Sequence, residues 1–216
     1  MKLSKFKKRV FTSIFLLLLT LLIFKFEMVM AFSLLILSVF SIIEFINLSK
    51  KIFTNNLYYY VFIFLFINFI SIFSFLFFFF SYFHQLKFIL LTLLLGCIAS
   101  DIGGYVFGKT LKGPKLTKVS PNKTIAGSIG SFIFSCAMIS GSIYYYTGIF
   151  NISILIIGFV TSLACQLGDL FFSYLKRKAK LKDTGNFLPG HGGVLDRLDG
   201  IYFGIPLGFL TLILFF

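Results

Sequence analysis

Charged side chains are scarce in this sequence, and acidic ones are the scarcest. Asp, Glu, Lys and Arg together make up 12% of the 216 residues, and only 7 residues are Asp or Glu. Soluble domains carry about twice that share of charged residues. The chain also contains 33 Phe, and its mean hydropathy is +0.99. No soluble fold of this length could bury so many apolar side chains, so the chain must use lipid as its solvent.

Cysteine is equally sparse. The three cysteines lie far apart, each inside an apolar run: Cys97, Cys136 and Cys165. No C-x-x-C or Cys–His spacing is present, which argues against the common zinc and disulfide frameworks. We therefore expect the three thiols to behave as small buried hydrophobic groups.

Long apolar runs take up most of the sequence. A bilayer core of about 30 Å needs about 20 apolar residues per helix. This length predicts an all-α, polytopic integral membrane protein with about seven transmembrane helices, at 10–24, 28–46, 58–80, 88–108, 128–150, 152–174 and 201–216. The first two could instead form a tight hairpin or a re-entrant pair. Because apolar spans continue and no small-residue cleavage site follows the first, we expect no removable signal peptide.

The formal net charge of +13 has an uneven distribution along the chain. Of the 20 basic residues, all but Lys25 and Lys87 fall in the N-terminal segment or in the second, fourth and sixth predicted loops. Cytoplasmic loops carry an excess of Lys and Arg, so we expect the N-terminus and these loops in the cytoplasm. The basic charge then reflects topology, and nucleic acid is not an expected partner.

The few acidic residues differ in their positions. Glu27 is expected in a short outer turn, and Glu44 near the cytoplasmic end of the second span, where it can reach water. Asp101 and Asp169 lie inside the fourth and sixth spans, about 12 Å and about 10 Å of helix rise from the next lysine. A carboxylate inside a membrane is costly, so we interpret this pair as functional, with two structural carboxylates as the alternative.

Asp196 and Asp199 are spaced i, i+3 just before the last span. If that segment is helical, both point to one face and suit a hard divalent cation; a solvated helix start is the alternative. In the fourth loop, Ser120, Pro121 and Lys123 form a helix-start signature. Ser120 is the expected cap, and the free N–H groups with the lysine predict an anion site.

A histidine flanked by glycines completes the polar inventory. His191 lies in Pro-Gly-His-Gly-Gly at 189–193, where glycines allow a backbone to approach a ligand closely. Carboxylates for Mg²⁺, basic groups for phosphates and a glycine-rich loop at the cytoplasmic edge of the membrane together favour phosphoryl or nucleotidyl transfer. The burial of the chain in the membrane indicates that one substrate is a lipid.

These residues resemble a known signature. The stretch SYLKRKAKLKDTGNFLPGHGGVLDRLDG at 173–200 resembles that of the phosphatidate cytidylyltransferases (CDP-diacylglycerol synthases), S-x-x-K-R-x-x-x-x-K-D-x-G-x-x-x-P-G-H-G-G-x-x-D-R-x-D. Two further blocks agree, SDIGGYVFGK at 100–109 and KVSPNKT at 118–124. The resemblance divides the chain into N-terminal transmembrane helices at 1–90, which match weakly, and a C-terminal catalytic region at 91–216.

The resemblance implies that the chain joins CTP to phosphatidate, giving CDP-diacylglycerol and pyrophosphate, with Mg²⁺ as cofactor. It also implies a bacterial-type inner (plasma) membrane protein that can form a homodimer. The implied metal ligands are Asp169, Asp196 and Asp199, and the implied catalytic residues are these three with Lys182 and His191. The implied substrate-binding residues are Asp101, Ser120, Lys123, Lys176, Arg177, Asp183, Gly192, Gly193 and Arg197.

The chain departs from the family pattern at two positions. Ala126 and Phe172 stand where the family often has Glu, which leaves the number of metal ions open. The chain is also short for the family. The alternatives are a CTP-dependent lipid or polyisoprenol kinase, an anion transporter and an inactive family member. A CDP-alcohol phosphotransferase is disfavoured, because the sequence has no D-G-x-x-A-R run.

Overall fold

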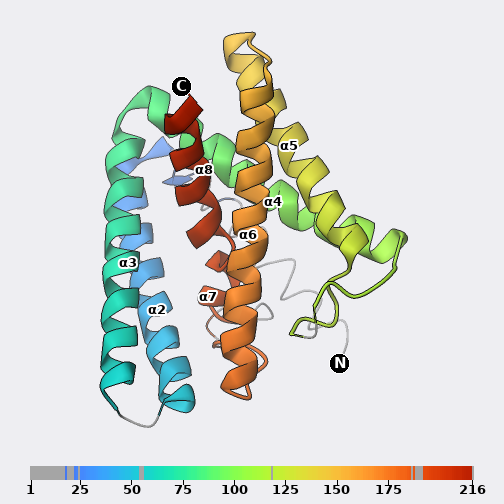
Figure 1. The fold of residues 1–216 in the computed structure, drawn as a ribbon. Helices are drawn as coiled ribbons and strands as arrows, with labels where there is room; N and C mark the ends of the chain where they lie inside the picture. Colours follow the sequence, from blue (N-terminus) through green and yellow to red (C-terminus); the bar gives the residue numbers. More distant parts are fainter. Residues whose placement is uncertain are drawn as a thin grey trace. The chain divides into compact units, whose positions relative to one another are not determined.

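The computed structural model describes residues 18, 22, 23, 25–53, 56–117, 119–185, 187 and 192–215. The regular secondary structure of the described chain consists of helices, and an isolated bridge joins Lys115 and Thr124 in the loop before α5. The helices are α2 (Glu27–Ile52), α3 (Leu57–Tyr82), α4 (His84–Thr110), α5 (Ile125–Thr147), α6 (Ile152–Lys178), α7 (Leu195–Leu198) and α8 (Ile201–Phe215) (Figure 1).

Six segments of the described chain are long and apolar enough to cross a membrane: α2, α3, α4, α5, α6 and the stretch Leu195–Phe215, which joins α7 to α8. The prediction of an all-α, polytopic membrane protein is therefore confirmed. The expected first span, 10–24, lies almost entirely outside the described residues.

The chain folds into two compact units. The first unit contains Met1–Tyr82 and Leu175–Leu198, and the second contains Phe83–Tyr174 and Asp199–Phe216. Each unit combines segments that are distant in sequence. Residues 175–198 of the signature stretch, called the signature loop below, belong to the unit built on α2 and α3.

In the first unit, α2 and α3 lie side by side (Figure 1). The Phe45 ring stacks on the Phe66 ring at a centroid distance of 3.6 Å, and the Ser38 and Ser74 hydroxyls are 2.7 Å apart. Packing and hydrogen bonds of this kind hold helices together where lipid removes the hydrophobic force between them.

The basic ends of α2 and α6 meet in the first unit. Helix α2 carries Lys50 and Lys51 in its last turn, and Lys178 near the end of α6 lies 5.6 Å from the Phe53 ring centroid. Two basic clusters distant in sequence therefore share one end of this unit, as expected of loops on one side of a membrane.

In the second unit, small residues let the helices approach closely. A Cβ atom on Gly127 would lie 2.8 Å from the Gly104 oxygen, and one on Gly158 would lie 2.7 Å from the Cys136 Cα atom. Cys97 and Cys165 are buried in this unit and Cys136 is half-buried, and all three are free thiols. The prediction of burial is confirmed for Cys97 and Cys165, and the Cys165 thiol also donates to Asp101 Oδ1 at 3.9 Å.

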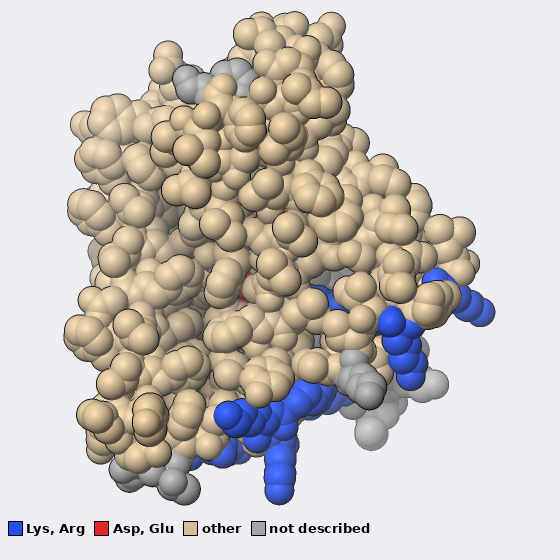
Figure 2. Space-filling view, in the orientation of Figure 1, with Lys and Arg blue, Asp and Glu red and all other residues tan. Residues whose placement is uncertain are grey.

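The basic residues of the described chain lie near the ends of helices and in loops. Helix α4 has one basic residue in its last turn, Lys109, and α6 has three, Lys176 to Lys178. Figure 2 shows Lys and Arg side chains against a surface that is otherwise almost free of charge. A surface with so little charge suits contact with lipid.

Candidate functional site

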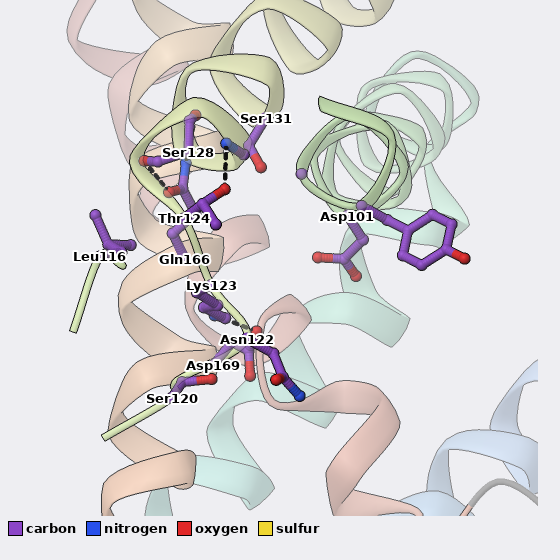
Figure 3. Close-up of a pocket in the computed structure, with 13 residues that line it drawn as sticks. Asp101, Leu116, Ser120, Asn122, Lys123, Thr124, Ser128, Ser131, Gln166 and Asp169 are labelled. Atoms are coloured by element: carbon purple, nitrogen blue, oxygen red, sulfur yellow. Dashed lines mark hydrogen bonds and ion pairs between the residues drawn. The ribbon is translucent and has the colours of Figure 1, made fainter. Parts of the chain in front are cut away.

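A cavity of about 320 Å³ opens in the second unit, between α4, α5, α6 and the loop that precedes α5. Its polar lining is drawn from four separate segments (Figure 3): Asp101 and Tyr105; Ser120, Asn122, Lys123 and Thr124; Ser128 and Ser131; Gln166 and Asp169. The cavity thus collects several predicted site residues, including the two intramembrane aspartates, which were expected at similar depth.

Lys123 and Asp169 form an ion pair inside this cavity. Their side chains are 26% and 33% exposed, so both remain accessible from the cavity. Asp101 lies on α4, across the cavity from α5 and α6 (Figure 3). One cation and two carboxylates therefore share a partly solvated site within otherwise apolar helices.

The expected helix start at Ser120 is wrong by several residues. Helix α5 begins at Ile125, and its N-cap is Thr124, whose side chain accepts a hydrogen bond from the Gly127 N–H at 3.1 Å. Ser120 to Lys123 instead form a turn, closed by the Lys123 N–H donating to the Ser120 oxygen at 3.1 Å. Pro121 suits the second position of such a turn as well as the first position of a helix, so the motif did not distinguish a turn from a helix start.

Two further hydrogen bonds tie this loop to its own earlier part. The Leu116 N–H donates to the Lys123 oxygen at 2.8 Å, and the Ile125 N–H donates to the Pro114 oxygen at 3.1 Å. These bonds hold Lys123 two residues before the start of α5, where its ammonium group reaches Asp169.

Sequence reasoning missed a set of neutral polar residues that line the cavity. The Ser128 hydroxyl donates to Gln166 Oε1 at 2.5 Å, and Gln166 Nε2 donates to the Ser162 hydroxyl at 3.2 Å. The Ser131 hydroxyl donates to the Ser100 oxygen at 2.8 Å. The only signal in the sequence was the presence of these polar types inside apolar spans.

In the first unit, the signature loop is organised around Asp196. Its Oδ1 accepts from Lys176 Nζ at 2.7 Å, and its Oδ2 accepts from the Thr184 N–H at 2.8 Å and the Gly193 N–H at 3.0 Å. Both charged side chains are nearly buried, at 11% and 6% exposure. A buried pair that is also hydrogen-bonded fixes its surroundings, because either partner alone would be left uncompensated.

Other predicted residues of the loop lie at its surface. Lys182, Asp183 and Arg197 are exposed, as is Arg177, whose Nη1 donates to the Leu181 oxygen at 3.3 Å. Gly192 has a φ of 85°, a conformation that favours glycine. His191 lies outside the described residues.

The interpretation of Glu44 as a solvated residue is wrong. Glu44 is 6% exposed, and its carboxylate accepts hydrogen bonds from the Thr184 hydroxyl, the Val194 N–H and the Leu195 N–H, at 2.7, 3.0 and 2.9 Å. A residue near the end of an apolar span looks solvated in sequence, because only the fold shows which loop covers it.

Asp199 belongs to the second unit and is 8% exposed. Its Oδ1 accepts from the Gly200 N–H at 2.9 Å. Helix α7 ends at Leu198, so Asp199 falls in the turn before α8, and the argument that it shares a helix face with Asp196 does not apply. Among the described residues, no three His, Cys, Asp or Glu side chains are arranged to hold a metal ion.

The two departures from the family pattern have different surroundings. Phe172 is 1% exposed, and its ring lies 6.3 Å from the Phe203 ring, edge to face. Ala126 lies in the first turn of α5 and is partly exposed. Position 172 is therefore part of an apolar core in this chain.

Comparison with known proteins places these motifs in context. The model of the cytidylyltransferase family matches residues 1–215. Phosphatidate cytidylyltransferases of Helicobacter pylori strain 26695, Rickettsia bellii and Synechocystis are 41%, 42% and 38% identical to this chain over 131, 132 and 143 residues. These matches cover 58%, 55% and 62% of this chain, and 47%, 56% and 48% of the relatives. The chain therefore spans about half the length of the relatives it matches.

Proposed function

This chain belongs to the cytidylyltransferase family, and from that premise we propose that it transfers the cytidylyl group of CTP to phosphatidate. A phosphate oxygen of phosphatidate attacks the α-phosphorus of CTP, the bond between the α-phosphorus and the bridging oxygen breaks, and pyrophosphate leaves. The products are CDP-diacylglycerol and pyrophosphate, as the names of the relatives suggest.

The observation that carries this proposal is the cavity around Lys123. At about 320 Å³ it lies at the lower end of the size range of ligand pockets. The Lys123 ammonium group, which pairs with Asp169, is placed to neutralise phosphate oxygens. Hydroxyl and amide groups line the remaining wall of the cavity. Positioning and charge neutralisation supply most of the catalysis of phosphoryl chemistry.

The donor set of this cavity fits Mg²⁺. Asp101, Asp169 and Gln166 offer oxygen atoms, the ligands that hard divalent cations prefer. Asp169, Asp196 and Asp199 remain the metal ligands that we propose from the family resemblance; of these, Asp169 lines the cavity, and Asp101 is proposed to contact the nucleotide. A bound cation would neutralise charge on the reacting phosphates. Asp196 has a second role here, because its oxygens also hold Lys176 and the loop backbone.

The signature loop supplies the remaining proposed contacts with phosphate groups. The exposed cations and backbone N–H groups of this loop are suited to bind anions, whereas Asp183 and His191 would shape the loop. The residues assigned to these roles in the loop are Arg177, Lys182, Asp183, His191, Gly192, Gly193 and Arg197. The nearly buried Lys176, and Ser120 in the turn before α5, are also proposed to bind substrate.

We place the active site at the cytoplasmic face of a bacterial plasma membrane. The meeting of the basic ends of α2 and α6 supports this orientation, because both clusters would then lie on the positive side. The acyl chains of phosphatidate can stay in lipid while its phosphate enters from that side. A homodimer remains part of the proposal.

Isotope position distinguishes this reaction from that of a lipid kinase. The purified protein in detergent would receive phosphatidate, Mg²⁺ and CTP labelled on either the α- or the γ-phosphorus. We expect lipid product labelled only from the α position, and no product with EDTA. Label from the γ position, with a polyisoprenol or another lipid as acceptor, would identify a kinase. No labelled lipid under any condition would refute both reactions.

Substitution of Lys123 tests the role of the cavity. Lys123→Met should lower kcat/KM for CTP about a hundredfold, because the negative charge on the reacting phosphates loses the ammonium group that neutralises it. Lys87→Met is the matched control, because Lys87 lies near the N-terminal end of α4 and does not line the cavity. It should change kcat/KM less than about twofold. Equal effects of the two substitutions would count against the cavity as the nucleotide site.

A further inference from the structure

A buried carboxylate on α2 holds the signature loop from outside that loop. Glu44 Oε1 accepts from the Val194 N–H at 3.0 Å, and Oε2 accepts from the Leu195 N–H at 2.9 Å and the Thr184 hydroxyl at 2.7 Å. All four residues belong to the first unit. Thr184 precedes the glycine-rich stretch of the signature and Val194 follows it, so one carboxylate binds both of its flanks.

Two signature glycines lie so close to Glu44 that a Cβ atom at either position would clash with it. A Cβ atom on Gly185 would lie 2.5 Å from Glu44 Oε1 and 2.9 Å from its Cδ atom. A Cβ atom on Gly193 would lie 2.7 Å from the same Cδ atom. Real Cβ atoms do not approach other atoms so closely, so any side chain at either position would displace the carboxylate or the loop.

An aromatic contact one turn earlier on α2 extends the attachment. Phe40 and Glu44 are spaced i, i+4, so both face the same side of α2. The Phe40 ring lies 3.7 Å, centroid to centroid, from the ring of Phe187, which is inside the signature stretch. Helix α2 thus presents one apolar and one charged anchor to the loop.

The chemistry of this site requires a carboxylate. Glu44 accepts from two backbone N–H groups, one on each oxygen. An amide of the same size would direct its NH₂ group at one of those N–H groups, whichever way it is turned. A buried N–H left without an acceptor is unfavourable, so Gln cannot replace Glu without releasing part of the loop.

We propose that Glu44 is a positioning residue of the enzyme, which fixes the signature loop so that its cations and Asp196 are presented to the phosphates of the substrates. This role rests on the proposed function. It assigns a part in the reaction to the N-terminal helices, for which the sequence motifs gave no indication.

The test compares Glu44→Gln with Glu27→Gln, the same change on an exposed residue of the same helix. Glu44→Gln should lower kcat about ten- to hundredfold and change the KM values for CTP and phosphatidate less than about threefold, because the groups are present but misplaced. Hydrogen exchange of the protein in lipid nanodiscs should become about tenfold faster at the amides of Val194 and Leu195. Glu27→Gln should change none of these quantities.

Hydrogen exchange in α5 reports whether the substituted protein is folded elsewhere. Exchange there should match the wild type in Glu44→Gln. Unchanged exchange at Val194 and Leu195, or a kcat equal to that of Glu27→Gln, would overturn the proposal. If the wild-type protein itself shows no turnover of CTP, the proposed function fails, while the exchange comparison still decides whether Glu44 holds the loop.

A double-mutant cycle gives an independent test through Gly185. Gly185→Ala alone should lower kcat, because the three atoms nearest to its new methyl group all belong to Glu44. In a Glu44→Ala background those three atoms are absent, so adding Gly185→Ala should change kcat less than about twofold. Equal, additive losses in both backgrounds would contradict a direct contact between Glu44 and the loop.

Discussion

The contact between α4 and α5 positions the cavity, and it can be tested with two glycines of one helix. Gly130 and Gly141 both lie inside α5. A Cβ atom on Gly130 would lie 2.5 Å from the Phe107 Cβ and Cγ atoms and 2.7 Å from the Gly103 oxygen, whereas one on Gly141 would meet nothing within 4 Å. The substitutions Gly130→Ala and Gly141→Ala therefore differ in packing alone.

The magnitude follows from separating two contributions. Replacing Gly by Ala in a helix favours folding by about 0.5–1 kcal/mol, and this contribution is common to both variants. Carbon atoms need about 3.5–4.0 Å, so the new methyl group at position 130 must move α4 and α5 apart by about 1 Å. Overpacking of this kind costs about 1–3 kcal/mol, which is the expected difference in unfolding free energy between the two variants.

Thermal unfolding in detergent measures this difference. For a chain of this size, 1 kcal/mol corresponds to about 2–4 °C, so Gly130→Ala should unfold about 2–12 °C below Gly141→Ala. Gly141→Ala should be as stable as the wild type or slightly more stable. Gly130→Ala should also lower turnover, because Gly104 on α4 and Ser131 on α5 line the cavity. Equal unfolding temperatures of the two variants would refute the packing argument.

Substitutions at two other positions test local features of the second unit. Thr124→Ala removes the cap of α5 and should destabilise the protein by about 1 kcal/mol, whereas Thr124→Ser, which keeps the hydroxyl that accepts from Gly127, should cost less than half of that. Thermal unfolding of both variants checks this, and equal losses would contradict the cap. Phe172→Glu introduces the residue that the family often has, but here it would bury a carboxyl group against Phe203 and should lower stability by about 2 kcal/mol or more. Phe172→Leu should cost clearly less in the same assay, and a Phe172→Glu protein as stable as the wild type would show that position 172 reaches water.

The membrane class and the main chemical groups of the site were predictable from sequence. Apolar runs of membrane length must become helices, because lipid leaves no other partner for backbone N–H and C=O groups. The scarcity of acidic residues made Asp101 and Asp169 conspicuous, and both line the same cavity. Lys123 was predicted as an anion-binding residue, and it lies in that cavity beside Asp169.

The errors arose where a motif has two local solutions or where a partner is distant in sequence. Ser120 and Pro121 suit a turn as well as a helix start, and the cap of α5 proved to be Thr124. Gln166 and Ser128 could not be paired from sequence, because 38 positions separate them.

Sequence alone determined the solvent of this protein, the helical form of its spans and the residue types available for phosphate chemistry, because these depend on local composition and on the thickness of a bilayer. Only the tertiary structure decided which helix holds the signature loop. Glu44 lies 150 positions from Val194, and a buried carboxylate acquires its role only when the chain brings N–H donors to it. Such a contact leaves no periodic trace in a sequence, since the hydrogen bonds are made to backbone groups that every residue except proline carries.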